Sequence, residues 1–128
     1  MLIVDDDDEL AALLHDLLDE EGYAVATAPD GAVALEMART NDPALIVLDL
    51  RMPNTDGRRF AIDYRARGGH ARILVLTALS EATTQSPIPG VDDVVMKPFD
   101  IDRLLERIAR LAHPAGLRSP RAPASETT

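Results

Sequence analysis

The stretch that decides the fold is Leu45–Gly57, which reads Leu-Ile-Val-Leu-Asp-Leu-Arg-Met-Pro-Asn-Thr-Asp-Gly. Its apolar first part ends in a single carboxylate, Asp49, and turn-forming residues follow. A continuous apolar run bounded by turn residues is typical of a strand that is buried on both faces, as in a parallel sheet. Open α/β sheets bind their ligands at the carboxyl ends of such strands, so this position suits a functional acid. Read alone, Asp49 fits a helix N-cap or a turn equally well.

Apolar segments and helical periodicities alternate on both sides of this stretch. Strands are expected at 2–4, 23–27, 44–48, 72–77 and 91–96, and helices between Asp8 and Gly22, over 32–39, between Gly57 and Gly68, and after Asp100. One apolar face marks the first helix, at Leu10, Leu13, Leu14, Leu17 and Leu18. Strands that alternate with helices indicate a parallel sheet built from βα units. Five strands with short connections predict a (βα)5, doubly wound, three-layer α/β domain.

Two segments depart from this pattern. The crossover over 79–90 has few apolar residues, and its Pro87 and Pro89 exclude a last helical turn, which predicts a weak or irregular fourth helix. From His113 onward, prolines mix with small and polar residues without any periodicity. We therefore expect one domain over 1–112, followed by a disordered tail or linker remnant over 113–128.

Composition and charge exclude several classes of function. The chain has no Cys, which excludes disulfides, thiol catalysis and Cys-based metal sites. Its formal net charge of −9 argues against nucleic-acid binding by this domain itself. No run approaches the roughly 18 apolar residues that span a bilayer, and no signal-peptide pattern opens the chain. A cytoplasmic protein without membrane contact is expected.

Polar residues of complementary chemistry follow four of the five predicted strands. They are Asp5 and Asp6, Asp49, Thr77, and Lys97. Because parallel strands present their carboxyl ends at the same edge of a sheet, these residues are expected on one rim. The three carboxylates repel one another unless a cation shares the site, and oxygen ligands suit Mg²⁺. Lys97 supplies a positive charge, and the Thr77 hydroxyl with the backbone N–H of Ala78 can bind phosphoryl oxygens. Since an Asp carboxylate can capture phosphate covalently, the set predicts phosphoryl transfer to Asp49.

Each of these signals has a structural alternative when it is taken singly. Lys97 alone fits a solvated surface lysine, and Thr77 alone fits a strand end or a turn. The acidic run from Asp5 to Glu9 alone fits a solvated loop or helix start. Because one chain carries residues of complementary chemistry at all four strand ends, a shared site is favoured over four unrelated structural roles.

Four short motifs occur in a fixed order along about residues 1–112. They are Val4-Asp5-Asp6, the run from Asp49 through Met52-Pro53 to Asp56-Gly57, Thr77-Ala78, and Lys97-Pro98-Phe99. Together they resemble the receiver domain of bacterial two-component response regulators. The resemblance implies a flavodoxin-like fold. It also implies Mg²⁺-dependent phosphotransfer to Asp49, from the phosphohistidine of a sensor histidine kinase or from a phosphotransfer protein.

The resemblance further implies a role for each site residue. Asp6 would bind the metal directly and Asp5 mainly through water, Asp49 would be both ligand and phosphoacceptor, and the backbone carbonyl of Arg51 would be a further ligand. Thr77 would bind the phosphoryl group and shift on activation, while Lys97 would pair with that group. Such a domain is not a conventional enzyme, because the reactions that it catalyses, phosphotransfer and a slow autodephosphorylation, take place on the domain itself. Its output would be a change of contacts with a downstream protein or a C-terminal effector domain, and a homodimer is left open.

Two departures from the family pattern fall on the surface that receivers usually use for output. Val94 stands where the family usually has an aromatic residue that is coupled to the switch threonine. The weak crossover over 79–90 replaces the fourth helix. We therefore expect retained phosphorylation chemistry and altered signalling through that surface.

Other function classes fit part of the pattern. The main alternative is a degenerate receiver that acts as a phosphorylation-independent interaction module, and the complete set of acids, threonine and lysine argues against it. A hydrolase with Asp49 as nucleophile would be favoured by an acid two residues later, where this chain has Arg51. Nucleotide binding lacks support, because no Gly-rich loop follows the first strand.

Overall fold

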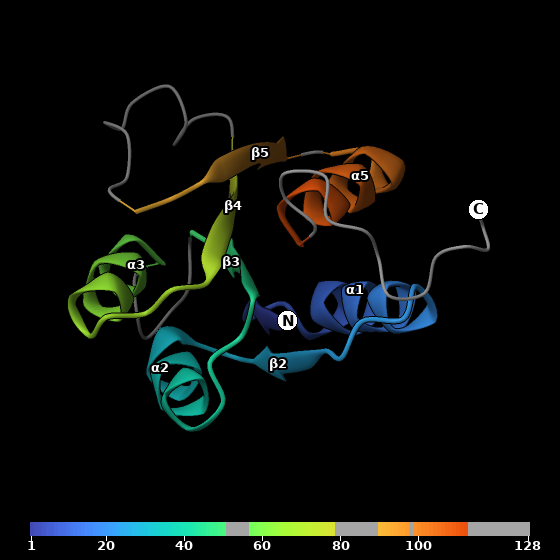
Figure 1. Cartoon of the computed structure of the whole chain (residues 1–128). Coiled ribbons are helices and arrows are strands. Elements are labelled where there is room, and N and C mark those ends of the chain that lie inside the picture. Colours follow the sequence, from blue (N-terminus) through green and yellow to red (C-terminus); the bar gives the residue numbers. More distant parts are fainter. Residues whose placement is uncertain (51–56, 79–89, 98, 113–128) are drawn as a thin grey trace.

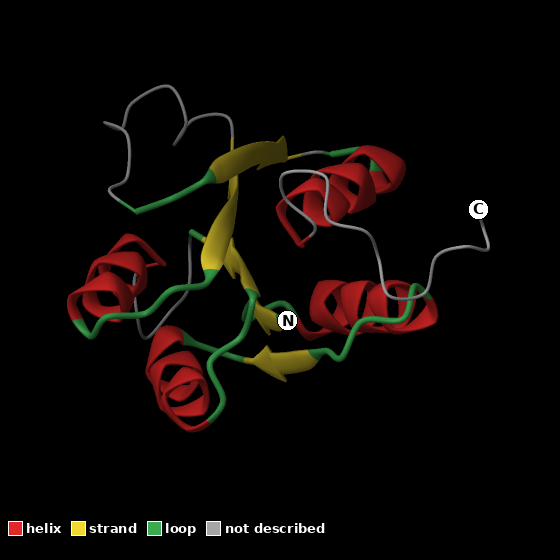
Figure 2. Ribbon diagram, in the orientation of Figure 1, coloured by secondary structure: helices red, strands yellow, loops and turns green. Residues whose placement is uncertain are grey.

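Five parallel strands run through the centre of the molecule in the order β2-β1-β3-β4-β5 (Figure 1). The computed structural model describes residues 1–50, 57–78, 90–97 and 99–112. The strands are β1 (Leu2–Val4), β2 (Ala26–Ala28), β3 (Leu45–Asp49), β4 (Arg72–Ala78) and β5 (Asp93–Lys97). The described helices are α1 (Asp8–Glu20), α2 (Gly31–Thr40), α3 (Gly57–Ala66) and α5 (Ile101–Ala112) (Figure 2). The predicted doubly wound, flavodoxin-like α/β fold is confirmed.

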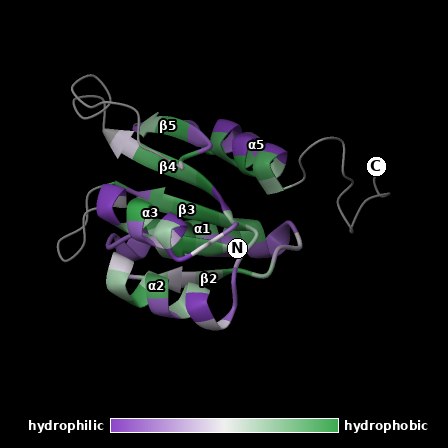
Figure 3. Cartoon of the chain, turned by 60° about the vertical axis from the view of Figure 1, so that its left-hand side comes forward, coloured by the Kyte–Doolittle hydropathy of each residue, from purple (hydrophilic) through white to green (hydrophobic). Residues whose placement is uncertain are grey.

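Of the described helices, α1 and α5 cover one face of the sheet and α2 and α3 cover the other, which gives three layers (Figure 1). On one face, Leu14 and Leu18 of α1 and Leu104 of α5 pack against alternate residues of the strands. On the other face, α2 and α3 pack against the remaining strand residues, and Phe60 of α3 is fully buried there. Figure 3 shows hydrophobic residues along the strands and hydrophilic residues on the outer sides of the helices. Burial on both faces explains the continuous apolar runs of the sequence.

Acidic side chains fix where three of the helices begin. The side chain of Asp7 accepts hydrogen bonds from the backbone N–H groups of the first turn of α1, and Asp30 and Asp100 do the same for α2 and α5. A carboxylate at this position satisfies N–H groups that have no partner within the helix and suits the helix dipole. These side chains therefore define where the helices begin after the strand ends.

Four strands differ from the predicted bounds: β3 and β4 differ by at most one residue at each end, and β2 and β5 begin two or more residues later than predicted. β2 begins at Ala26 instead of residue 23, because its neighbour β1 has only three residues with which it can pair. β5 begins at Asp93 instead of residue 91 and extends to Lys97. Of the crossover over 79–90, where a weak or irregular fourth helix is expected, residues 79–89 lie outside the described part of the chain, as does the expected tail over 113–128, so the domain boundary at residue 112 stays a prediction.

The predicted apolar face of α1 is wrong at one position. Leu13 is 45% exposed, whereas Leu14 is fully buried. In a helix that covers one side of a sheet, the buried stripe follows residues three and four apart, here Ala11, Leu14 and Leu18. Leu13 lies next to that stripe and points away from the core.

This difference predicts unequal costs for two equal truncations. Leu14→Ala is expected to lower the free energy of unfolding by about 2–5 kcal/mol, because it removes buried methyl groups and leaves a cavity. Leu13→Ala is the matched control and is expected to change it by no more than about 1 kcal/mol. Urea unfolding followed by circular dichroism measures both. Equal costs would mean that α1 is rotated from the orientation described above.

Candidate functional site

The two central acids lie where the winding of the sheet reverses. β1 and β3 are neighbours in the sheet, and the chain continues from one to β2 and from the other to β4. Asp5 follows β1 directly, and Asp49 is the last residue of β3. Such a reversal opens a crevice at the carboxyl ends of the strands, where ligands of doubly wound sheets bind. The structure therefore brings Asp5 and Asp49 to the expected edge.

Three carboxylates form a cluster at this edge. One oxygen each of Asp5, Asp6 and Asp49 lies within 4.8 Å of the others. Asp5 is 2% exposed and Asp49 is 6% exposed, whereas Asp6 faces solvent. Oxygen donors at this spacing are the ligand type of a hard divalent cation, and the exposed Asp6 leaves a path for its entry.

The Asp5 carboxyl group lies in surroundings where a bound cation or a proton would stabilise it. Its Oδ1 accepts a hydrogen bond from the backbone N–H of Asp7 at 2.9 Å, but its buried Oδ2 has no hydrogen-bond partner among the described residues. Burial raises the pKa of Asp5 to about 7, and the negative charge of Asp49 adds to the rise. A buried oxygen without a partner is costly, and a bound cation would satisfy it. The residues present therefore fit Mg²⁺.

Lys97 supplies the positive charge of the site. As the last residue of β5, it places its Nζ 3.4 Å from Oδ1 of Asp49. Its side chain is about one-third exposed, at 33%, so the ammonium can reach an incoming ligand. Lys97 is also the only lysine among the 128 residues of the chain. The structure thus places Lys97 beside Asp49, and its pairing with a phosphoryl group stays a prediction.

Thr77 and Ala78 lie at the end of β4, beside Asp49. The strand partner of Asp49 is Leu76, and Thr77 follows it immediately. Thr77 is 3% exposed, and Ala78 pairs in the ladder with Lys97. The strand ends that carry the acid, the hydroxyl group and the lysine are therefore adjacent.

Two other predicted features have different outcomes. The backbone carbonyl of Arg51, expected as a metal ligand, lies outside the described residues. Val94 is described, and its side chain is 43% exposed on β5, across the ladder from Val75. The structure thus places no bulky aromatic ring at this position next to the strand of Thr77.

Gly57 has a role at this site that the sequence reading missed, because Asp56-Gly57 alone was interpreted as a turn. The N–H of Gly57 donates a hydrogen bond to the carbonyl oxygen of Leu50 at 3.0 Å. A Cβ atom on Gly57 would lie 2.6 Å from the carbonyl oxygen of Asp49. Only glycine lets α3 begin directly against the backbone of the acidic residue. The signal was present as the fixed spacing between Asp49 and Gly57.

Comparison with known proteins identifies the family of this fold and site. The family model of the response regulator receiver domain matches residues 1–109. The chain belongs to this family. Receiver domains are signalling domains of two-component systems, which agrees with an acidic cluster and a lysine at one sheet edge.

Named relatives and solved structures support the same assignment. Response regulator MprA of Mycobacterium sp. (strain KMS) is 37% identical over 113 residues, which cover 87% of this chain and 49% of the relative. Transcriptional regulatory protein PrrA of Mycobacterium bovis is 38% identical, covering 91% of this chain and 51% of the relative. The receiver domain of the Francisella response regulator 1452 is 32% identical with a TM-score of 0.77, covering 87% of this chain and 93% of that one. TrrA of Thermotoga maritima, solved in complex with Mg²⁺-BeF, is 33% identical with a TM-score of 0.75, covering 86% and 96%.

Two further observations concern the length of the chain and its helices. This receiver chain spans about half the length of the curated relatives it matches. Within the described residues, no helix combines the length and the apolar character that crossing a bilayer requires.

Proposed function

We propose that Asp49 accepts a phosphoryl group from the phosphohistidine of a sensor histidine kinase or of a phosphotransfer protein. The single observation that carries this proposal is the contact of 3.4 Å between Lys97 Nζ and Asp49 Oδ1 beside two further acids. Three neighbouring carboxylates repel one another and favour positive charge beside them, and Lys97 supplies that charge directly at Asp49.

The chemistry that we propose is an in-line displacement at phosphorus. A carboxylate oxygen of Asp49 forms a bond to phosphorus while the bond from phosphorus to the imidazole nitrogen of the donor breaks. The leaving nitrogen keeps the electron pair, and because the other ring nitrogen of the donor carries a proton, the histidine ends as a neutral imidazole. Lys97 pairs with the phosphoryl oxygens, and Thr77 with the N–H of Ala78 donates hydrogen bonds to them. In the slow autodephosphorylation, a water oxygen forms a bond to phosphorus while the bond from phosphorus to the Asp49 oxygen breaks, and the products are the free carboxylate and inorganic phosphate.

We further propose that Asp5, Asp6 and Asp49 hold Mg²⁺, with the Arg51 carbonyl as an additional ligand. When bound, the ion offsets the charge that these acids and the phosphoryl oxygens bring together. The burial of Asp5 and Asp49 keeps water from competing for their oxygens. Asp6, at the exposed edge, lies where an arriving ion first meets the cluster.

We place this reaction in the cytoplasm and propose that phosphorylation changes the contacts of the domain with a downstream protein or with an effector domain. The length of the curated relatives agrees with the second option. Because Val94 replaces the usual aromatic residue and is 43% exposed, we expect the outer side of β5 to transmit the change differently from the family pattern.

Phosphoryl uptake by the purified chain tests the proposal. Incubation with Mg²⁺ and a small acyl phosphate is expected to add the mass of one phosphoryl group, and chelation of Mg²⁺ is expected to prevent the gain. Asp49→Asn is expected to abolish it, because an amide oxygen is a far weaker nucleophile than a carboxylate. Asp63→Asn, which changes a described acid on α3, is the matched control and is expected to react like the unsubstituted chain.

Failure of the unsubstituted chain to take up phosphate, with Mg²⁺ bound, would contradict the proposal and favour the degenerate interaction module. Uptake that persists in Asp49→Asn would move the phosphoacceptor to another residue. Intact-mass spectrometry distinguishes these outcomes, because each predicts a different mass for the two proteins.

A further inference from the structure

The edge strand β5 carries Lys97, yet hydrophobic burial does little to fix its register. None of its five residues is fully buried, and Val94 and Met96 are 43% and 49% exposed. By contrast, all five residues of β3 are buried. The pairing register of a strand is strongly specified when it buries one hydrophobic face, and weakly specified when it does not. Val95 packs against the core on the α5 face but is only partly buried, so contacts other than burial are needed to hold β5 in one register.

The site depends on this register. Lys97 reaches Asp49 because it pairs with Ala78 at the end of the ladder between β4 and β5. A shift by one residue would move Lys97 by about 3.3 Å and turn its side chain to the opposite face of the sheet. A shifted strand could form comparable backbone hydrogen bonds with β4, so the side chains must select the register.

On the α3 face, the start of β5 is held by Arg65. The Arg65 guanidinium donates hydrogen bonds to the carbonyl oxygen of Gly90, at 2.7 and 3.1 Å, and to that of Gly69 at 3.1 Å. It also lies 3.3 Å from Oδ2 of Asp92, which accepts a hydrogen bond from the N–H of Ile73 at 2.8 Å. One arginine thus joins α3, the entry to β4 and the entry to β5.

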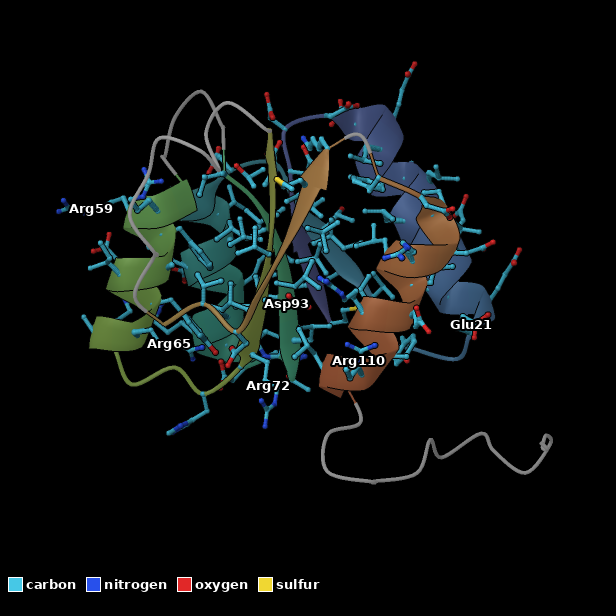
Figure 4. All side chains as sticks on the ribbon, turned by 90° about the horizontal axis from the view of Figure 1, so that it is seen from above. Glu21, Arg59, Arg65, Arg72, Asp93 and Arg110 are labelled. Atoms are coloured by element: carbon cyan, nitrogen blue, oxygen red, sulfur yellow. The ribbon has the colours of Figure 1, made fainter. Side chains whose placement is uncertain are left out.

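On the α5 face, the next residue is held by Arg107. Its Nη1 lies 3.0 and 3.1 Å from the two carboxylate oxygens of Asp93 and 3.2 Å from the carbonyl oxygen of Val94. Figure 4 shows Arg65 on the helix at one side of the sheet, with Asp93 on β5. Because successive side chains of an extended segment point to opposite faces, Asp92 and Asp93 each meet an arginine from the helix on their own side.

We propose that Arg65 and Arg107 are positioning residues for phosphoryl transfer, because they hold β5 in the register that places Lys97 at Asp49. This inference rests on the proposed function of Asp49. In any shifted register, both carboxylates would leave their arginines, and a shift by one residue would also turn both to the opposite face of the sheet. The two ion pairs therefore select the register at the start of β5. That register places Lys97, the last residue of the strand, at Asp49.

The single lysine of the chain gives a direct readout. In a protein labelled with ¹³C and ¹⁵N only at lysine, one side-chain resonance reports Lys97. In the unsubstituted chain, this resonance is expected to differ from that of a free lysine and to move when beryllium fluoride and Mg²⁺ are added. In Arg65→Ala/Arg107→Ala, it is expected to match a free lysine before and after the addition.

The phosphorylation rate and the Mg²⁺ affinity of the double variant together distinguish a misplaced Lys97 from a general loss of structure. The double variant is expected to take up phosphate from a small acyl phosphate about tenfold more slowly or worse, because a misplaced charge loses its effect on the reaction. Its Mg²⁺ affinity is expected to stay within about threefold, because the three acids lie on or beside β1 and β3. Arg39→Ala is the matched control, since it removes the ion pair with Glu36 on α2 and leaves β5 unchanged.

A charge swap keeps the inference testable if the double variant does not fold. Asp93→Arg is expected to behave like Arg107→Ala, and Asp93→Arg/Arg107→Asp is expected to restore both the rate and the Lys97 resonance. A native Lys97 resonance and a native rate in folded Arg65→Ala/Arg107→Ala, or a swap that restores neither, would overturn the inference. If the unsubstituted chain takes up no phosphate, the proposed function fails, and the Lys97 resonance in metal-free protein alone decides the register inference.

Discussion

Lys97→Ala is expected to slow phosphoryl uptake at Asp49 by about 100-fold while Mg²⁺ binding is retained. The Lys97 ammonium lies 3.4 Å from Asp49 Oδ1 in a pocket where the acid is almost completely buried. A positive group that is already oriented toward the transferring phosphoryl group stabilises the transition state more than the separated reactants. Loss of the Lys97 charge also leaves Asp49 without this positive partner. The attraction of the three acids for Mg²⁺ is therefore not weakened. Initial rates of mass gain from a small acyl phosphate, at saturating Mg²⁺, measure the effect.

Arg110→Ala serves as the matched control for this prediction. It removes one exposed positive charge from the last turn of α5 and leaves the strand ends untouched. Its rate is expected to stay within about twofold, because exposed charges are screened beyond about 10 Å at ordinary salt concentration. An equal loss in Arg110→Ala and Lys97→Ala would show that overall charge, and not the position of Lys97, controls the reaction.

Asp5→Asn is expected to make the metal-free protein more stable above pH 7, by up to about 4 kcal/mol in the free energy of unfolding. Burial raises the pKa of Asp5 from 3.8 to about 7, with Asp49 contributing and the N–H of Asp7 and the charge of Lys97 opposing. Below about pH 4, both the folded and the unfolded state hold the proton. Between about pH 4 and 7, only the folded state holds it, so the contribution of Asp5 to stability falls as the pH rises. Above about pH 7, the dependence ends.

Urea unfolding in a chelating buffer at pH 5 and pH 8 measures this effect. The unsubstituted chain is expected to lose stability between these values relative to Asp5→Asn, and added Mg²⁺ is expected to return it. Asp5→Asn is expected to bind Mg²⁺ about tenfold more weakly or worse. Asp19→Asn changes an exposed acid of α1 and serves as control, with the same pH dependence as the unsubstituted chain. Identical pH profiles for Asp5→Asn and the unsubstituted chain would contradict the burial of an ionised Asp5.

The sequence predicted the sheet well because its strands are buried on both faces. Leu45–Asp49 is a continuous apolar run that ends in an acid, and this combination identified the central strand, whereas the site was predicted only when the ends of the other strands were considered as well. The starts of the first helix at Asp8 and of the last helix after Asp100 were equally readable, because capping depends on local residues alone. The juxtaposition of Asp5, Asp49 and Lys97 followed from parallel topology, which brings the ends of separate strands together.

Features that depend on precise rotation or on distant partners could not be read from the chain. The exposure of Leu13 depends on how α1 is rotated about its axis by a few tens of degrees, which a pattern of five leucines does not resolve. The pairs of Arg65 with Asp92 and of Arg107 with Asp93 join residues 27 and 14 positions apart. No local pattern marks either arginine. The close approach of Gly57 to Asp49 likewise became evident only when the start of α3 was placed against β3.

The most direct test of the central claim is to locate the phosphoryl group on the unsubstituted chain. After reaction with a phosphohistidine-bearing donor and Mg²⁺, fragmentation mass spectrometry of the peptide that spans Leu45–Asp49 should find the added mass on Asp49. The modification should disappear on treatment with hydroxylamine, as expected for an acyl phosphate. Stable phosphate on His15, on a hydroxyl group, or on any residue other than Asp49 would contradict the account.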